Sequence, residues 1–218
     1  MDEKSLIQSL GLSSDVIYDI AVRVLRPEER SILDLGCGQG QLLKRLRDAG
    51  AQDLTGCDGY HYPELDTQGI RFVQADLQKE FPFADNSFSA VSAIEVIEHL
   101  ENPWHFVREI FRVLKPGGLA LVSTPNNECI TSTLSLITRG YFSAFADSCY
   151  PAHITPVLRN DLDRMFRKAG AKNPQVIWSD SGRIPRLDQR WQSISKSLFR
   201  GKFFSDNYLL QGRKPHAS

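Results

Sequence analysis

The chain has 218 residues, of which 41% are apolar and 24% are charged, and its formal net charge is zero. These proportions are ordinary for a globular protein with one well-formed core. Zero net charge excludes an overall electrostatic bias toward nucleic acid or membranes. The charge is unevenly distributed, because residues 183–214 contain eight basic and two acidic residues. This tail therefore carries a net charge of +6, and the rest of the chain carries −6.

The cysteines and the start of the chain bear on the cellular compartment. Cys37, Cys57, Cys129 and Cys149 form no CxxC pair and lie far apart, so the pattern requires neither a disulfide nor zinc. The first four residues, Met-Asp-Glu-Lys, lack the basic start and apolar run of a signal peptide. No uninterrupted apolar stretch approaches the roughly 20 residues that span a bilayer. We therefore expect a cytoplasmic protein.

Apolar periodicity predicts alternating helices and strands from residue 14 to residue 124. Ser14 precedes a helical pattern that Pro27 ends. Short apolar strands and further helical patterns then alternate. The predicted strands are 31–35, 53–57, 70–75, 88–93 and 119–124, and the predicted helices among them run from Leu42 to a stop at Gly50 and over 103–114. This alternation indicates parallel βαβ units in a doubly wound sheet.

The regular pattern breaks down between Asn126 and His153, where serine, threonine and aromatic residues are common. A stretch of this length in a compact domain is typically functional, and we expect a lid over the site at about 127–158. A helix over 159–169 and strands over 176–178 and 207–211 follow, with a basic, aromatic segment at 183–204. The predicted fold is α/β. It is a single doubly wound, Rossmann-like domain over 1–218, with a mostly parallel seven-stranded sheet and a lid insertion after strand 5.

A glycine-rich turn follows the first predicted strand, in the sequence Asp34-Leu-Gly36-Cys-Gly38-Gln-Gly40. Glycines let the backbone approach a ligand closely, and the N-terminus of the following helix offers unpaired N–H groups to an anion. The dinucleotide-binding fingerprint requires G-x-G-x-x-G, and the alternate spacing of these three glycines does not match it. The turn alone is weak evidence of a ligand, because plain strand–helix connections also use glycine.

Acidic residues follow the next two strands, and the order of these motifs carries a resemblance. Asp58 ends the second strand, and Asp76-Leu77 follows the third. Ile94-Glu95-Val-Ile-Glu98-His99 follows the fourth strand, a Leu-Lys-Pro-Gly-Gly turn precedes the fifth, and Ser-Thr-Pro-Asn126 ends it. Taken together over residues 31–126, the chain resembles the class I S-adenosylmethionine-dependent methyltransferases, including small-molecule O-methyltransferases with Glu-x-x-Glu-His after strand 4.

The resemblance implies S-adenosyl-L-methionine as cofactor, bound by the half of the chain at 31–126. It implies that Asp34 organises the glycine turn and that Gly36 and Gly38 line the methionine end. Asp58 would accept hydrogen bonds from the ribose hydroxyls, a role that suits an ionised carboxylate. Asp76 and Leu77 would border the adenine, and Ile94 would lie near the sulfonium. Gly40 and Glu95 complete the set of predicted cofactor-binding residues.

Candidate catalytic residues gather after the fourth strand and in the lid: Glu98, His99 and His153. Three interpretations stay open at this point. The first is structural, with Glu98 and His99 orienting the helix that Pro103 opens. In the second, His99 or His153 is a general base for a hydroxyl acceptor. In the third, Glu95 and these three residues bind a divalent metal, as the similarity of Glu-x-x-Glu-His to small-RNA 2′-O-methyltransferases implies. The chain lacks that family's second neighbouring histidine at His153, and we assign no metal ligand from the sequence.

The methyl acceptor is the least defined part of the prediction. We expect O-methylation of a small molecule, such as a quinone precursor, a sugar or a cell-surface glycan intermediate. The alternatives are an RNA 2′-O-methyltransferase with a divalent metal and a non-catalytic S-adenosylmethionine-binding regulatory module. The absence of overall basicity disfavours nucleic acid. The segment 183–204 predicts an amphipathic helix that packs its aromatic residues on the core, with weak membrane or lipid-linked substrate contact as an alternative. The sequence gives no oligomeric state.

Overall fold

The computed structural model describes residues 13–25, 31–62, 70–187 and 189–216. Seven strands form one sheet in the order β3-β2-β1-β4-β5-β7-β6. The strands are β1 (Ile32–Leu35), β2 (Leu54–Asp58), β3 (Arg71–Gln74), β4 (Phe88–Ile94), β5 (Leu114–Pro125), β6 (Lys172–Trp178) and β7 (Asn207–Arg213). The first five strands pair in parallel, and β7 pairs antiparallel with both β5 and β6. The predicted mostly parallel, seven-stranded α/β sheet is confirmed.

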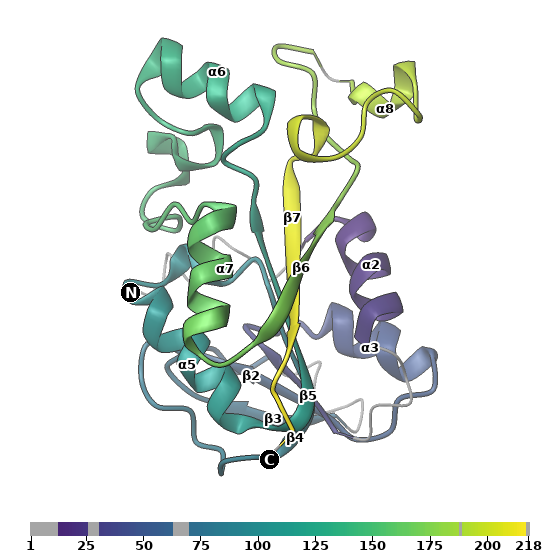
Figure 1. The fold of residues 1–218 in the computed structure, drawn as a ribbon, viewed down its shortest axis with the longest axis vertical. Coiled ribbons are helices and arrows are strands. Elements are labelled where there is room, and N and C mark those ends of the chain that lie inside the picture. Colours follow the sequence, from purple (N-terminus) through teal and green to yellow (C-terminus); the bar gives the residue numbers. More distant parts are fainter. Residues whose placement is uncertain (1–12, 26–30, 63–69, 188, 217–218) are drawn as a thin grey trace.

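Helices cover both faces of this sheet (Figure 1). The helices are α2 (Asp15–Leu25), α3 (Gln41–Asp48), α5 (Pro103–Val113), α6 (Ile130–Arg139), α7 (Arg159–Lys168) and α8 (Trp191–Ile194). The apolar side chains of α2 and α3 belong to one buried cluster, and those of α5 and α7 belong to the other. A sheet buried on both sides explains why its strands read as short continuous apolar runs rather than as alternating patterns.

Helix α2 begins after Ser14 and buries apolar residues at helical spacing, as the sequence pattern predicts. The Ser14 carbonyl oxygen accepts hydrogen bonds from the amides of Ile17 and Tyr18 at 3.0 and 3.2 Å. Ile17, Ile20 and Leu25 are buried at helical spacing. Pro27, the predicted stop, lies outside the described residues, as do the four residues at the start of the chain that bear on a signal peptide. Leu25 is the last residue of α2 and also the last described residue before the gap at 26–30.

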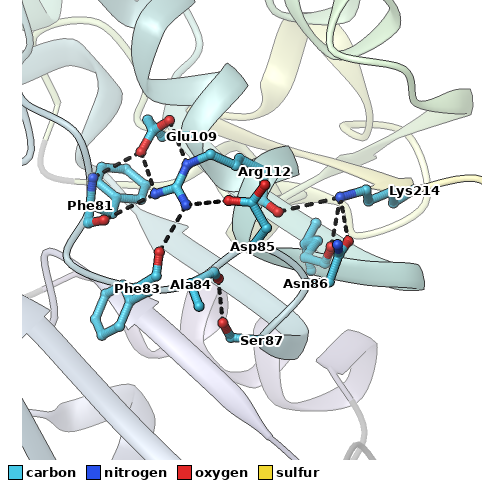
Figure 2. A network of polar contacts seen from close by, with 10 residues as sticks. Phe81, Phe83, Ala84, Asp85, Asn86, Ser87, Glu109, Arg112 and Lys214 are labelled. Atoms are coloured by element: carbon cyan, nitrogen blue, oxygen red, sulfur yellow. Dashed lines mark hydrogen bonds and ion pairs between the residues drawn. The ribbon is translucent and has the colours of Figure 1, made fainter.

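An arginine-centred network ties α5 to the loop between β3 and β4 (Figure 2). The Arg112 guanidinium donates to both carboxylate oxygens of Glu109 at 2.9 and 2.7 Å and to Asp85 at 2.7 Å. It also donates to the carbonyl oxygens of Phe81 and Phe83. Burial opposes ionisation of Glu109, but hydrogen bonds from Arg112 and the Phe81 amide lower the pKa of its carboxyl group. The network fixes the loop that begins just after β3.

The lid region contains a helix that the sequence pattern did not indicate. Helix α6 buries Ser132 and Ser135 and exposes Leu134, Leu136 and Ile137. Its polar residues are therefore buried and its apolar residues exposed, which is the reverse of an ordinary surface helix. Short 3₁₀ turns over 143–145 and 147–149 follow it, and the chain returns to the core at Val157.

The segment 183–204 does not form the predicted amphipathic helix on the core. Helix α8 has only four residues, and Trp191, Phe199 and Phe204 pack on one another with ring centroids 5.0–5.5 Å apart. None of these three rings belongs to the two buried apolar clusters. Leu198 and Phe203 are exposed, at 74% and 57% of their full surface. The expectation was wrong because it assumed helical spacing that the turns in this segment interrupt.

Within the described ranges, no helix is both long enough and apolar enough to cross a membrane. The four cysteines are free thiols, of which Cys37, Cys57 and Cys129 are buried.

Candidate active site

A cleft of about 1190 Å³ opens at the carboxyl ends of β1, β2 and β4. This is the edge at which open α/β sheets bind their ligands. Its walls contain seven of the predicted cofactor-binding residues and all three predicted catalytic residues: Asp34, Gly36, Asp58, Asp76, Leu77, Ile94, Glu95, Glu98, His99 and His153. Gly38 and Gly40 are not among the described residues that line it. One cleft therefore brings together residues that are more than a hundred positions apart in the sequence.

The glycine turn between β1 and α3 has the backbone that its sequence suggests. Gly36, Gly38 and Gly40 all have positive φ, at 66°, 50° and 77°, a region that other residues rarely adopt. A side chain at Gly36 would also collide with Val96, whose Cγ2 would lie 2.4 Å from the added Cβ. Gly40 is the N-cap of α3. The turn therefore depends on glycine for its backbone conformation and, at Gly36, for its close packing.

Asp34 is a buried carboxyl group beneath this turn. It retains 3% of its surface, and its Oδ1 accepts a hydrogen bond from the Ser92 hydroxyl at 2.7 Å. Burial raises the pKa of Asp34 from 3.8 to about 7, against the opposing effect of the Ser92 hydrogen bond. Near neutral pH this group is therefore divided between its protonated and its ionised form, which is unusual for an aspartate.

Asp58, at the end of β2, links two loops of the cleft. Its Oδ2 accepts a hydrogen bond from the Gly38 amide at 2.9 Å, and its Oδ1 accepts one from the Tyr60 amide at 3.1 Å. Burial raises the pKa of Asp58, and these backbone hydrogen bonds oppose the rise. Each carboxylate oxygen has two lone pairs, so both oxygens can accept a further hydrogen bond from a ligand.

The predicted adenine-side and sulfonium-side residues occupy different parts of the same cleft. Asp76 is exposed, and its Oδ1 accepts from the Gln78 amide at 3.0 Å. Leu77 is buried beside it, with 8% of its surface exposed. Ile94 is partly buried at the end of β4. The cleft therefore has an exposed acid, Asp76, and a buried apolar residue, Leu77, after β3, and a partly buried apolar residue, Ile94, at the end of β4.

Glu95 has a left-handed backbone, with φ of 54°, which is uncommon for a residue other than glycine or asparagine. Its side chain is held by Asn207 on β7, whose Nδ2 donates to Glu95 Oε1 at 2.5 Å. Burial raises the pKa of Glu95. The backbone turn at Glu95 directs the chain away from β4 into the short 3₁₀ helix Ile97–His99.

Glu98 is completely buried. Its Oε2 accepts a hydrogen bond from the Thr124 hydroxyl at 3.1 Å, and its Oε1 has no hydrogen-bond partner among the described residues. Burial, together with the nearby Glu95 carboxylate, raises the pKa of Glu98 well above its ordinary value. An unpartnered buried carboxylate oxygen is energetically unfavourable and calls for an explanation.

His99 and His153 lie next to each other, with ring centroids 4.8 Å apart and ring planes at 70°. His99 Nδ1 is 2.7 Å from the Ala152 carbonyl oxygen, and His153 Nδ1 is 2.6 Å from the Ala144 carbonyl oxygen. Burial lowers the pKa of His99. Glu98, His99 and His153 each offer one ligand atom, and these three atoms lie within 4.8 Å of one another. We call these residues the Glu–His–His cluster.

The cleft also contains residues that the sequence reasoning did not single out. Tyr18 reaches it from α2, and its hydroxyl accepts a hydrogen bond from the Ser13 amide at 2.9 Å. Cys149 reaches it from the lid, and Asn207 holds Glu95. The spacing of Tyr18 within α2 matches a buried face, so its sequence context suggested only a core position. Asn207 opens a predicted strand, and no local signal connects it to Glu95.

Comparison with known proteins identifies the family. A family model described as a methyltransferase domain matches residues 15–176. The chain is 30% identical over 221 residues to 27-O-demethylrifamycin SV methyltransferase of Amycolatopsis mediterranei, a match that covers 88% of this chain and 79% of that protein. It is 24% identical over 207 residues to the mitochondrial ubiquinone biosynthesis O-methyltransferase of Dictyostelium discoideum, across 86% of this chain. The chain spans only 60% of the length of that relative.

A solved structure shares the fold. The S-adenosylmethionine-dependent methyltransferase of Thermotoga maritima superimposes with a TM-score of 0.68 at 18% identity, covering 90% of this chain and 87% of the other. The family model spans well over half of the chain, and apart from Ser13 the described residues that line the cleft lie within the part that it matches. The chain therefore belongs to the S-adenosylmethionine-dependent methyltransferase family, whose methyl donor is S-adenosyl-L-methionine.

Proposed function

We propose that this chain transfers the methyl group of S-adenosyl-L-methionine to a hydroxyl oxygen of a small molecule. The observation that carries the proposal is the single cleft in which the acids at the strand ends and the Glu–His–His cluster face the same space. Two relatives support the acceptor class, because one is named for O-methylation in ubiquinone biosynthesis and the other for a demethylated rifamycin.

We propose a cofactor orientation that follows the order of residues along the cleft. Asp58 accepts hydrogen bonds from the ribose hydroxyls through the free lone pairs of its carboxylate. Asp76 and Leu77 border the adenine, and Gly36, in the turn that Gly38, Gly40 and Asp34 shape, lines the methionine end. Ile94 and Glu95 then lie between the cofactor and the Glu–His–His cluster. This orientation places the methyl group toward the histidines.

Transfer of the methyl group is an in-line displacement at carbon. Alignment alone contributes strongly, because oriented reactants reach effective molarities on the order of 10⁵ M. A hydroxyl acceptor must also lose its proton, so the site needs a group that favours the deprotonated oxygen. We assign this role to Glu98, His99 and His153, which form the polar part of the cleft nearest to the lid.

The ion pairs of the basic tail favour a small acceptor over a nucleic acid. Arg183 pairs with Asp206 at 3.1 Å, and Arg200 pairs with Asp180 at 3.0 Å. Lys202 pairs with Glu128 at 2.6 Å. Phosphate recognition depends on basic groups that are free to neutralise the backbone. Asp206 is already counted in the net charge of +6 of the tail, whereas Asp180 and Glu128 lie outside it, so the latter two pairs lower the positive charge that is available for a phosphate backbone.

We propose that residues 1–218 act as one methyltransferase domain. In this division 31–126 hold the cofactor and about 127–158 form the lid over the acceptor. Two contacts between the lid and the turn after β4 support it, because the amides of Ile154 and Thr155 each donate to the Glu98 carbonyl oxygen at 3.0 Å.

The test is transfer of labelled methyl from S-adenosyl-L-methionine into an extract of the host cell, followed by separation of small molecules, lipids, RNA and protein. We expect label in the small-molecule fraction, and we expect it as an alkali-stable methyl ether. The cofactor-site variant Asp58→Ala, assayed at the same protein concentration, serves as the control for contaminating activities. Label confined to RNA would contradict the proposed acceptor. Binding of the cofactor without transfer into any fraction would favour a regulatory module.

A further inference from the structure

We propose that the methyl acceptor is a vicinal amino alcohol, a small molecule whose hydroxyl group stands next to a protonated amine that binds Glu98. This inference rests on the proposed function, because it names the chemical class of the acceptor at the same site. Two independent observations carry it. One is the sign of the charge around the cleft, and the other is a buried carboxylate oxygen that lacks a partner among the described residues.

Acidic side chains dominate the described lining of the cleft, which contains six carboxyl groups and no lysine or arginine. The six are Asp34, Asp58, Asp76, Glu95, Glu98 and Glu101. A cleft lined by charges of one sign raises the local concentration of ligands of the opposite sign. An acceptor with a carboxylate or phosphate group would meet like charges and no cationic partner here. The lining therefore selects against anionic acceptors.

The cofactor does not use all of these acids. The proposed cofactor orientation involves the three aspartates, which lie at the glycine turn and at the ribose and adenine ends of the cleft. Of the glutamates, Glu101 is exposed to water, which screens its charge. Glu95 is held by Asn207, which donates to its Oε1 at 2.5 Å. Glu98 is the acid that remains for the acceptor.

Glu98 is completely buried, yet it lines the cleft. The Thr124 hydroxyl donates to Oε2 at 3.1 Å, and Oε1 has no hydrogen-bond partner among the described residues. No arginine or lysine of the described chain forms an ion pair with Glu98. Buried carboxylates normally have a cationic partner. An ammonium group supplies both the positive charge and the N–H donor that Oε1 lacks.

The two histidines beside Glu98 are prepared to accept the proton of a hydroxyl group. A carbonyl oxygen can only accept, so the Nδ1 atoms of His99 and His153 carry the protons that they donate to Ala152 and Ala144. In a neutral imidazole this leaves a lone pair on Nε2. The cluster therefore combines a carboxylate for a cation with an imidazole nitrogen for a hydroxyl proton.

The spacing of these groups fits a hydroxyl and an amine on neighbouring carbon atoms. One carboxylate oxygen of Glu98 and one ring nitrogen of each histidine lie within 4.8 Å of one another. The nitrogen and oxygen of a gauche amino alcohol are about 3 Å apart, and each forms a hydrogen bond of about 2.8 Å to its partner. Three such links bend to join two atoms at this separation. A neutral diol can occupy the same positions but leaves Glu98 without a counter-charge.

The ion pair with Glu98 also decides which acceptor atom is methylated. A protonated amine has no lone pair, so its nitrogen cannot attack the methyl group. The hydroxyl proton passes to the Nε2 atom of one histidine, and the oxygen forms a bond to the methyl carbon as the carbon–sulfur bond breaks. The sulfonium leaves as a neutral thioether. The product is a methyl ether beside an unmodified amine.

The test compares three probes that share a cyclohexane ring and differ in charge. They are trans-2-aminocyclohexanol, trans-1,2-cyclohexanediol and trans-2-hydroxycyclohexanecarboxylate. Each is titrated at pH 7 into the full-length chain saturated with S-adenosylhomocysteine, and calorimetry measures its affinity. We expect the amino alcohol to bind about tenfold or more tightly than the diol, because hydrogen bonds to charged groups are the stronger ones. The carboxylate should bind more weakly than the diol.

A charge-neutral variant assigns the preference to one residue. Glu98→Gln keeps the size of the side chain and an oxygen for Thr124, and it should bring the affinities for the amino alcohol and the diol to within about twofold, with an unchanged circular dichroism spectrum. Glu101→Gln is the matched control, because it removes the same charge from an exposed part of the cleft and should retain the preference.

Three results would overturn the proposal: equal affinity of the wild type for the amino alcohol and the diol, tightest binding of the carboxylate, or an unchanged preference in Glu98→Gln. The first two concern the wild type alone, so they do not depend on the folding of a variant. Because binding and not methyl transfer is measured, these results are independent of whether the proposed O-methylation stands.

Discussion

The protonation of Asp34 couples the stability of the protein to pH. Its folded-state pKa of about 7 exceeds the ordinary value of 3.8 because the carboxyl group is buried. Between these values the folded protein binds a proton that the unfolded chain has released, so the free energy of unfolding falls as the pH rises through this range. Asn cannot ionise and retains an oxygen for the Ser92 hydroxyl. We predict that Asp34→Asn is more stable than wild type by roughly 2–4 kcal/mol at pH 8.

Chemical denaturation at pH 5 and pH 8 measures this difference. The advantage of Asp34→Asn should be smaller at pH 5, where most Asp34 in the folded wild type is already protonated. Ser92→Ala removes the hydrogen bond but leaves the carboxyl group, so it should keep the pH dependence. A gap between Asp34→Asn and wild type that is the same at both pH values would contradict the assigned pKa.

Asp58 is the residue whose loss should affect cofactor binding most directly. We predict that Asp58→Ala weakens S-adenosyl-L-methionine binding by about 2 kcal/mol or more, because a ligand hydroxyl loses a charged hydrogen-bond acceptor. Isothermal titration calorimetry measures the affinity. Asp53→Ala is the matched control, since Asp53 is exposed just before the opposite end of β2. Equal affinities for wild type and Asp58→Ala would remove Asp58 from the cofactor site.

Single residues differ in how far the sequence could predict them. The position of Asp58 and Asp76 at the cleft was predictable, because parallel strands all point their carboxyl ends to one edge of the sheet. The Gly38–Asp58 hydrogen bond spans 20 positions and the Glu95–Asn207 bond spans 112. Such contacts depend on how loops pack, and no local pattern encodes them. The unpartnered Oε1 of Glu98 could not be predicted either, because its lack of a hydrogen-bond partner among the described residues depends on how distant segments pack around it.

At the scale of elements, Arg112 joins α5 to the loop that carries the exposed acid of the cleft. We predict that Arg112→Lys lowers the free energy of unfolding by about 2 kcal/mol, because an ammonium group cannot reproduce the guanidinium's paired hydrogen bonds. Denaturant titration checks this value. Arg108→Lys on the exposed face of the same helix should change stability by no more than about 0.5 kcal/mol. A loss of the same size in both variants would show that the network contributes little.

Helix α6 was missed for a physical reason. Its sequence is rich in serine, threonine and isoleucine, which have modest helix propensity. The apolar residues that should mark a buried face are exposed, and the buried side is formed by Ser132 and Ser135. The apolar pattern that normally marks the buried face of a helix therefore lies on the exposed face of α6. Elements with a conventional apolar face, such as α5 and α7, were predicted to within about one residue at each end.

The exposed apolar residues of α6 and of the segment 183–204 lie at the same end of the molecule (Figure 1). Weak contact of this end with an anionic lipid surface stays a prediction. Vesicles with anionic headgroups should co-sediment the protein at low salt, and binding should fall as salt rises. Lys196→Glu removes one positive charge and adds one negative charge, so it should weaken binding by about thirtyfold, given about 1 kcal/mol for each charge near such a surface. Arg108→Glu, the same charge change on α5, should have little effect, and binding that ignores salt would contradict the prediction.

At the scale of the whole molecule, the sequence was sufficient for the fold class and for the position of the site. Glycine-rich turns and strand-end acids mark the edge of a parallel sheet, and the cleft lies there. The antiparallel insertion of β7 between β5 and β6 could not be derived, because the last two strands are separated by an irregular segment. The extra length of β5, which begins at Leu114 rather than near Leu119, was hidden by its Lys-Pro-Gly-Gly sequence.

The most direct test of the central claim is a crystal structure of the chain with S-adenosylhomocysteine. The account predicts that the ribose hydroxyls lie within hydrogen-bond distance of the Asp58 carboxylate, with the adenine beside Leu77. It also predicts that the sulfur atom faces the Glu–His–His cluster across Ile94. A ligand in the cleft whose sulfur points away from His99 and His153 would contradict the proposed direction of methyl transfer. A ligand bound outside this cleft would contradict the assignment of the site.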